Sequence, residues 1–205
     1  MKLNLGCSGQ VINGWINVDY ALGCRFAKFP FFNSINKKLG LFDQIWDNRI
    51  FIHNLKKTFP WPDQSVECIY ASHILEHFTK EEGIRLLQEC FRVLKKDGII
   101  RIIVPDLAVI VQQYQKDKIK AENFLEEIDV LYRTYPNKLK TYLAPFIQFP
   151  HKCMYDFSSL QRIATQIGFS KIEKKQGFDS QIFDIKMIEL ENRVQDAVIF
   201  EAKKP

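Results

Sequence analysis

The stretch Lys2-Leu-Asn-Leu-Gly-Cys-Ser-Gly-Gln10 opens the chain with its most informative pattern. The alternating apolar residues predict a short strand at 2–5, and the glycines predict a tight turn after it. A second apolar run begins at Trp15 and ends in Asp19. A strand that stops at a glycine turn brings backbone N–H groups close to a ligand. A carboxylate ending the neighbouring strand can accept hydrogen bonds from a ribose diol. The pattern points to an adenosine-type cofactor.

Short apolar runs alternate with helical patterns along the chain. Strands are expected at residues 2–5, 15–19, 50–54, 67–71 and 98–104, and two late strands near 170–175 and 196–202. Thr79 and Glu82 have the spacing of a capping box, so a helix should begin there, and Asp97-Gly98 should end it. Apolar strands that alternate with helices predict an α/β fold with a parallel sheet covered on both faces.

Two segments interrupt this alternation. Residues 106–150 carry one helical pattern from Leu107 to Tyr114, a second from Phe124 to Tyr135, and an aromatic, proline-rich stretch. A further helix should end at Gly168. We expect a helical lid at about 106–150, extending to 156 on the substrate side, over the end of the sheet. The aromatic-rich segment 20–49 is a second irregular insertion.

Length and composition bound the class of protein. The 205 residues fit a single domain, 1–205, and 46% apolar with 26% charged residues is typical of a globular protein. The net charge of +5 comes from dispersed basic residues, which favours a solvated surface over a nucleic-acid site. We expect no transmembrane segment and no signal peptide, and the five cysteines form no Cys-x-x-Cys pair. Reduced thiols and a cytoplasmic location are expected.

Small or polar residues follow each of the first five strands. They are Gly6-Cys-Ser-Gly9, Asp19, His53-Asn54-Leu55, Ala71-Ser72-His73 and Val104-Pro105-Asp106. Ligands of open parallel sheets bind beyond the carboxyl ends of the strands, so these residues should face one crevice.

Longer motifs carry a family resemblance. Phe59 to Phe78, with the stretch from Arg92 to Arg101, resembles the class I S-adenosylmethionine-dependent methyltransferases. The chain is also similar to a branch of this family that is often predicted from cell-surface polysaccharide gene clusters. This similarity lies in residues 3–7, 14–19, 151–156 and 201–205. The resemblance implies a Rossmann-like, seven-stranded, mostly parallel sheet with one late antiparallel strand. It also implies S-adenosylmethionine as cofactor and S-adenosylhomocysteine as product.

The resemblance also implies a cofactor site. Its residues are Leu5, Gly6, Cys7, Ser8, Gly9, Asp19, Asn54, Leu55, Ser72 and His73. Gly6 to Gly9 would line the methionine and ribose portion, Asp19 the ribose hydroxyls, and Asn54 the adenine. Ser72 and His73 would lie near the transferred methyl group. Ser8 stands at a position where members of the family commonly have glycine. Asn54 stands where they usually have an acidic residue that binds the adenine amino group. Only a short turn of helix fits before Gly14, so we expect the first crossover to be shortened and to be covered by segment 20–49.

Methyl transfer needs a positioned acceptor and, for a hydroxyl acceptor, a base. The candidates are His73, His151, Tyr155 and Asp106, and a histidine is favoured because its pKa lies near neutrality. The expected acceptor is a hydroxyl or carboxyl of a small molecule or surface-glycan precursor. No stable nucleic-acid partner is expected. Peripheral membrane contact is an open alternative, because Phe31 and Phe32 lie among basic residues.

Three other functions remain open at this stage. The first is an RNA or nucleic-acid methyltransferase, although no appended RNA-binding module is present. The second is a non-catalytic domain that keeps the cofactor fold. The third is a zinc hydrolase, because His73-Ile-Leu-Glu-His77 has the spacing of an inverted zinc-protease motif. No third ligand is identifiable on a downstream helix, so Glu76 and His77 are expected to pack structurally and no metal is expected.

Overall fold

The computed structural model describes residues 1–40, 42, 44–132, 141–142, 144–145 and 148–205. Seven strands form one sheet in the order β3-β2-β1-β4-β5-β7-β6. They are β1 (Lys2–Leu5), β2 (Ile16–Asp19), β3 (Phe51–Ile52), β4 (Val66–Ser72), β5 (Leu94–Pro105), β6 (Ser170–Lys174) and β7 (Ala197–Lys203). The first five pair in parallel, and β7 is antiparallel to both of its neighbours. The predicted sheet with one late antiparallel strand is confirmed.

Strand β5 is longer than the sequence predicts. Helix α3 (Lys80–Val93) ends where β5 begins, so Asp97-Gly98 lies inside the strand instead of ending the helix. Asp97 has a φ of 59°, and the pairing with β4 shifts register between Val66 and Cys68. Such an irregularity absorbs turn-forming residues within a strand.

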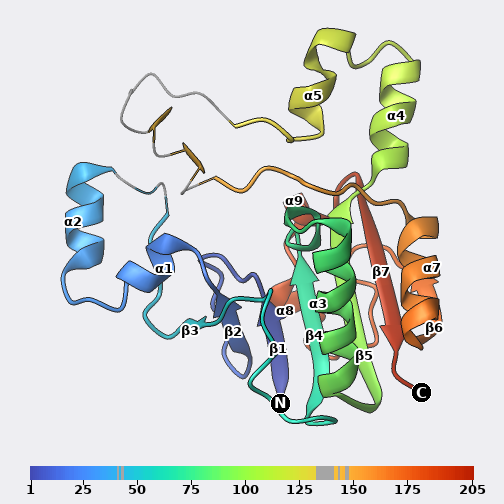
Figure 1. Ribbon diagram of the computed structural model, residues 1–205, viewed down its shortest axis with the longest axis horizontal. Coiled ribbons are helices and arrows are strands. Elements are labelled where there is room, and N and C mark those ends of the chain that lie inside the picture. The colour runs from blue at the N-terminus through green and yellow to red at the C-terminus, as the bar shows by residue number, and fades with distance from the viewer. Residues whose placement is uncertain (41, 43, 133–140, 143, 146–147) are drawn as a thin grey trace.

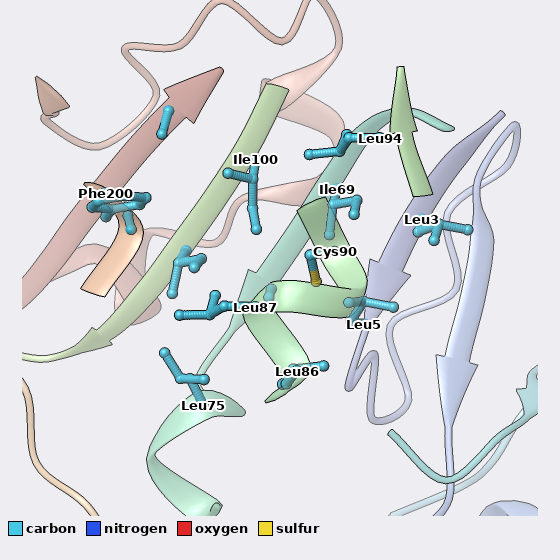
Figure 2. Close-up of a cluster of buried hydrophobic side chains, with 14 of the residues drawn as sticks. Leu3, Leu5, Ile69, Leu75, Leu86, Leu87, Cys90, Leu94, Ile100 and Phe200 are labelled. Atoms are coloured by element: carbon cyan, nitrogen blue, oxygen red, sulfur yellow. The ribbon is translucent and has the colours of Figure 1, made fainter. Parts of the chain in front are cut away.

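Alternate residues of the central strands point to opposite faces of the sheet. Ile69, Ile100 and Phe200 lie in the larger core, which also contains Leu86 and Leu87 of α3. Figure 2 shows α3 laid across these side chains. This face also receives Leu160 and Ile163 of α7 (Phe157–Ile167), whose end at Gly168, φ 113°, is confirmed.

The opposite face is covered differently. Tyr70, Ile103 and Ile199 pack there against Ile185 and Ile188, which belong to the short helix α8 (Ile185–Ile188). Another short helix, α9 (Glu191–Val194), follows. Arg101 and Glu201 project from the sheet on this side. Arg101 pairs with Glu201 at 3.1 Å and with Glu189 at 2.8 Å, all three side chains being buried. The sheet is therefore covered on both faces, as predicted.

The first crossover is short, and it contains turns but no helix between β1 and β2. The single helical turn expected there is wrong. Two buried asparagines hold the loop instead. Asn17 accepts from the backbone of Ile12 at 3.0 Å and donates to its carbonyl, while Asn4 donates to Asn17 and to the carbonyl of Gln10. Side-chain amides replace the hydrogen bonds that a helix would supply.

Segment 20–49 contains α1 (Leu22–Phe26) and α2 (Phe32–Leu39), which lie on the β2–β3 side of the sheet, with α2 farther out than α1 (Figure 1). Cys24, Ala27 and Trp46 of this segment form a core cluster with Cys7 and Val11 of the first crossover. The segment thus covers the crossover that lacks a helix.

The helices of segment 106–150 that the structure describes lie beyond the carboxyl end of the sheet (Figure 1). It contains α4 (Leu107–Gln115), the 3₁₀ helix η2 (Ala121–Asn123) and α5 (Phe124–Glu127). The second helix was expected to reach Tyr135, but α5 stops at Glu127, before Asp129 at φ 51°. A left-handed residue cannot continue a right-handed helix. Tyr135 lies outside the described residues.

Among the described residues, no helix combines the length and the apolar character needed to cross a bilayer.

Candidate functional site

A cavity of about 600 Å³ opens at the carboxyl ends of the strands. It is lined from the cofactor side by Gly6, Ser8, Asp19, Asn54, Leu55, Ser72 and His73. Segment 20–49 adds Tyr20 to Gly23, Phe42, Gln44 and Trp46, and the later chain adds Tyr132, Pro145, Gln148, Phe149, Pro150, Lys152 and Arg193. The volume falls within the roughly 300–1,000 Å³ of small-molecule sites. The structure therefore brings together most of the sequence-predicted cofactor residues.

The turn after β1 has the backbone geometry that close approach to a ligand requires. Gly6 has a φ of +66°, and a Cβ at this position would lie 2.6 Å from Cγ1 of Ile74. Ser8, at φ 53°, occupies the same left-handed region, which explains why glycine would be the less strained residue there. The turn needs glycine at position 6 and tolerates serine at position 8.

The Asp19 carboxylate ties the ends of β1 and β2 together. Its Oδ2 accepts from the backbone N–H of Ser8 at 2.8 Å, and its Oδ1 accepts from Tyr20 at 2.7 Å and Ala21 at 2.8 Å. Burial raises the pKa of this carboxyl, while the backbone hydrogen bonds lower it. A carboxylate has about four acceptor positions. Asp19 therefore keeps capacity for a ligand hydroxyl.

Three of the predicted cofactor residues support the site from behind. Leu5 is buried in the larger core, and Cys7 packs between segment 20–49 and the crossover. Burial raises the pKa of the Cys7 thiol far above its usual range, so it is a packing residue. The Cα of Gly9 faces the side chain of Gln44, leaving no room for a Cβ. None of these three lines the cavity.

Asn54 and Leu55 line the cavity after β3. The Asn54 side-chain oxygen accepts from the backbone N–H of Lys56 at 3.0 Å, and its carbonyl accepts from Lys57 at 2.9 Å. These two hydrogen bonds fix the turn that follows β3.

His73 follows β4 in a strained turn. Its φ is 51°, and its Nε2 lies 2.9 Å from the carbonyl of Arg193. A carbonyl only accepts, so this nitrogen carries the proton. Nδ1 then faces Oε1 of Glu76 at 3.4 Å. His73 is a cavity-lining residue with one nitrogen free to accept a proton.

The other three candidate bases lie outside the cavity lining. Asp106 caps α4 by accepting from Ala108 at 3.0 Å and pairs with Lys174 at 3.3 Å. Tyr155 is buried in the larger core under α3, and burial raises the pKa of its hydroxyl. His151 lies behind His77, with ring centroids 5.1 Å apart. We therefore give Asp106 and Tyr155 structural roles.

Some lining residues are not evident from sequence patterns. Gln44 and Trp46 reach the cavity because segment 20–49 folds over the glycine turn, and Ser8 donates to Gln44 at 2.8 Å. In the sequence, their place in the cavity is indicated only by the fact that segment 20–49 directly follows the carboxyl end of β2. His77 lines the cavity, although the sequence favoured structural packing for it. Burial lowers the pKa of the His77 ring.

Comparisons with known proteins assign the domain. Residues 36–102, which run from α2 to β5, match a family described as "Methyltransferase domain". The strand order and the antiparallel β7 complete the fold of class I members. The chain therefore carries a methyltransferase domain within the class I, S-adenosylmethionine-dependent methyltransferase fold. This methyltransferase is an enzyme whose methyl donor is S-adenosylmethionine and whose product is S-adenosylhomocysteine. No curated protein sequence matches the chain significantly.

Solved structures share the fold of the methyltransferase at low identity. A SAM-dependent methyltransferase from Methanosarcina mazei is 15% identical, with a TM-score of 0.55, over 99% of this chain and 91% of that one. One from Archaeoglobus fulgidus is 19% identical, with a TM-score of 0.50, over 99% and 85%. A possible histamine N-methyltransferase from Thermotoga maritima is 16% identical, with a TM-score of 0.52, over 100% and 81%.

The methyltransferase's cavity has the donor groups that such a cofactor needs. Gln44 Nε2 and Trp46 Nε1 are buried and have no hydrogen-bond partner among the described residues. Both residues line the cavity beside the glycine turn. A buried donor without a partner is costly, so a ligand that offers oxygen or nitrogen acceptors would satisfy them. The residues present fit S-adenosylmethionine.

Proposed function

We propose that the enzyme methylates an oxygen atom, a hydroxyl or a carboxyl, of an anionic small molecule or surface-glycan precursor. The observation that carries this proposal is the set of cationic and aromatic residues that line the cavity. Lys152 and Arg193 line it together with the rings of Tyr132, Phe149 and Phe78. Aromatic faces offer apolar contact area, and the two cations attract a negatively charged acceptor.

The cofactor residues have separate roles in this proposal. The Gly6–Gly9 turn and Asp19 hold the methionine and ribose portion, and Asn54 with Leu55 holds the adenine. Bound S-adenosylmethionine supplies an electrophilic methyl group. The protein then has to align the acceptor oxygen and exclude water, and segment 106–156 serves as the lid.

A hydroxyl acceptor also has to lose a proton. His73 lines the cavity, and its Nε2–H is held by the carbonyl of Arg193. Its Nδ1 is therefore the proton-accepting atom. The buried Glu76 carboxylate, 3.4 Å away, would stabilise the imidazolium that results. A carboxyl acceptor is already ionised near neutral pH and needs no such base.

A transfer assay tests the acceptor class. The enzyme is incubated with methyl-labelled S-adenosylmethionine and with matched pairs of acidic and neutral glycosides. We expect label on the acidic members, and mild alkali tells an ester, which is cleaved, from an ether, which is not. Label on a nitrogen atom or on RNA, or no transfer to any acidic acceptor, would contradict the proposal.

Two variants refine this assay. Lys152→Gln should lower kcat/KM for the acidic acceptor about tenfold, equivalent to ~1.4 kcal/mol, because a charge contact is lost. Lys96→Gln, an exposed residue near the start of β5, is the matched control and should have no effect. His73→Asn, whose side chain tolerates positive φ, should lower kcat for a hydroxyl acceptor but not for a carboxyl acceptor.

A further inference from the structure

Three potential metal ligands meet beside the cavity. Glu76, His77 and His151 each offer one ligand atom, and these atoms all lie within 4.8 Å of one another. Glu76 and His77 belong to the 3₁₀ helix η1 (Leu75–His77), which follows β4. The backbone carbonyl of Glu76 accepts from Lys152 at 2.8 Å and Cys153 at 3.2 Å, which fixes the neighbouring His151 against η1. Backbone hydrogen bonds therefore hold the two chain segments that carry these three side chains next to each other.

The Glu76 carboxylate is buried, and no hydrogen bond from the described residues stabilises its charge. Its side chain is 1% exposed, and neither oxygen has a hydrogen-bond partner among the described residues. An ionised carboxylate in such a position is costly unless a cation accompanies it. Lys or Arg side chains do not pair with Glu76 in the part of the chain that the structure describes. Oε1 instead faces His151 Nε2 at 3.9 Å and His73 Nδ1 at 3.4 Å.

The ring of His151 is oriented as a ligand. Its Nδ1 lies 2.8 Å from the carbonyl of Ile128 and must donate to it. In the neutral ring Nε2 then carries a lone pair that faces Glu76. A backbone carbonyl that holds the far N–H of a histidine is the usual support for a metal-binding imidazole. His77 adds a buried Nδ1 with no partner among the described residues.

We propose that Glu76, His77 and His151 bind one divalent cation that favours imidazole nitrogen, with Zn²⁺ as the representative ion. Two nitrogens and one carboxylate oxygen suit zinc-like ions better than Mg²⁺ or Ca²⁺, which prefer oxygen. His77 lines the cavity, so a fourth position would open toward it. Asp129, with Oδ2 3.9 Å from His151 Nε2, is a further carboxylate at the same place.

This site differs from the one that the sequence motif suggested. Residues 73–77 form a turn and a 3₁₀ helix, so His73 and His77 do not share a helix face. The third ligand, His151, comes from the chain after segment 106–150 instead of from a downstream helix. The proposal goes beyond the proposed function, because the ion would be held whichever acceptor the enzyme methylates. It also revises the sequence-based expectation of no metal.

Metal content and metal-dependent stability test the site. The untagged full chain is stripped with a chelator and titrated with ZnCl₂ by calorimetry, with thermal unfolding measured in parallel. We expect one ion per chain and a higher Tm with zinc. His151→Gln and Glu76→Gln should weaken binding at least tenfold, while His53→Gln, a histidine outside the cluster, should bind as the wild type does.

Free cysteines could also capture zinc, so the ligand type needs its own readout. Co²⁺ substitution should give a visible spectrum without a thiolate charge-transfer band. A thiolate band, or unchanged zinc binding in His151→Gln, would overturn the proposal. So would a wild type that binds no zinc. Methyl transfer to a different acceptor class would overturn the proposed function alone and leave this site intact.

Discussion

The backbone N–H of Ser8 donates to Oδ2 of Asp19 over 2.8 Å, so the end of β2 holds the turn that follows β1. The same carboxylate binds the backbone of Tyr20 and Ala21, where segment 20–49 begins. One side chain therefore organises the glycine turn and the entry of the segment that covers it.

Asp19→Asn tests this relationship. An amide has one oxygen acceptor and no charge, so it cannot keep all three backbone hydrogen bonds and also accept from a ribose hydroxyl. A hydrogen bond to a charged group contributes about 1.5–3 kcal/mol, so the Kd for S-adenosylhomocysteine should rise at least tenfold. Calorimetric titration measures this. Asp63→Asn, whose side chain is 72% exposed, should bind like the wild type. Equal affinity in both variants would remove Asp19 from the site.

Gly6→Ala should destabilise the enzyme through two separate effects. A left-handed alanine costs roughly 1–2 kcal/mol, and the new Cβ would also meet Ile74 at 2.6 Å. Gly14→Ala is the matched control, because Gly14 has a φ of +81° but no heavy atom within 4 Å of a Cβ. Urea unfolding should therefore show a larger loss for Gly6→Ala. Equal losses would mean that the close approach to Ile74 has no energetic weight.

Arg101 is expected to be essential for stability. Arg101→Leu leaves Glu189 and Glu201 buried without their shared cation, and breaking such a buried pair typically costs about 3–5 kcal/mol. Denaturant unfolding should show this loss. The exposed pair Arg49–Asp47 is the comparison, since Arg49→Leu should change stability little. Full stability of Arg101→Leu would contradict this prediction.

The N-cap of α7 predicts a pH dependence. Hydrogen bonds from Ser159 lower the pKa of Asp156 below its unfolded value of 3.8, so its contribution is present above that pH and is lost as the pH falls through the folded value. Asp156→Asn keeps a good cap without a titrating group, so its stability should fall less below about pH 4. Asp156→Ala should lose about 0.5–2 kcal/mol at neutral pH. Parallel acid unfolding curves for wild type and Asp156→Asn would contradict this prediction.

The strands could be predicted from the sequence because they follow local patterns, whereas the seven-stranded sheet with its late antiparallel strand was implied by the family resemblance. Short apolar runs mark the strands, and the capping box of Thr79 and Glu82 marks the start of α3, as the structure confirms. The residues at which helices end follow less directly from the sequence. Asp97-Gly98 is a turn signal that the strand absorbs as an irregularity, and Asp129 ends a helix whose apolar pattern continues.

The site could be predicted only where it depends on strand ends. Gly6, Asp19 and His73 lie near one another because parallel strands end at one edge of the sheet. The positions of Gln44 and His151 depend on how irregular segments fold back. Backbone hydrogen bonds to Glu76 place His151, and no periodic pattern records them. Tyr155 is a catalytic candidate by sequence, and its side chain lies in the larger core, where its backbone forms a bridge with that of Asp106.

The central claim is that the cavity beyond Gly6 and Asp19 holds S-adenosylmethionine. Thermal unfolding of the full chain with increasing S-adenosylhomocysteine tests it most directly, because a ligand that binds only the folded state must raise Tm. We predict a saturable rise in the wild type and a rise at least tenfold less sensitive to ligand concentration in Asp19→Asn. An unchanged Tm at millimolar ligand, or identical curves for the two proteins, would contradict the claim.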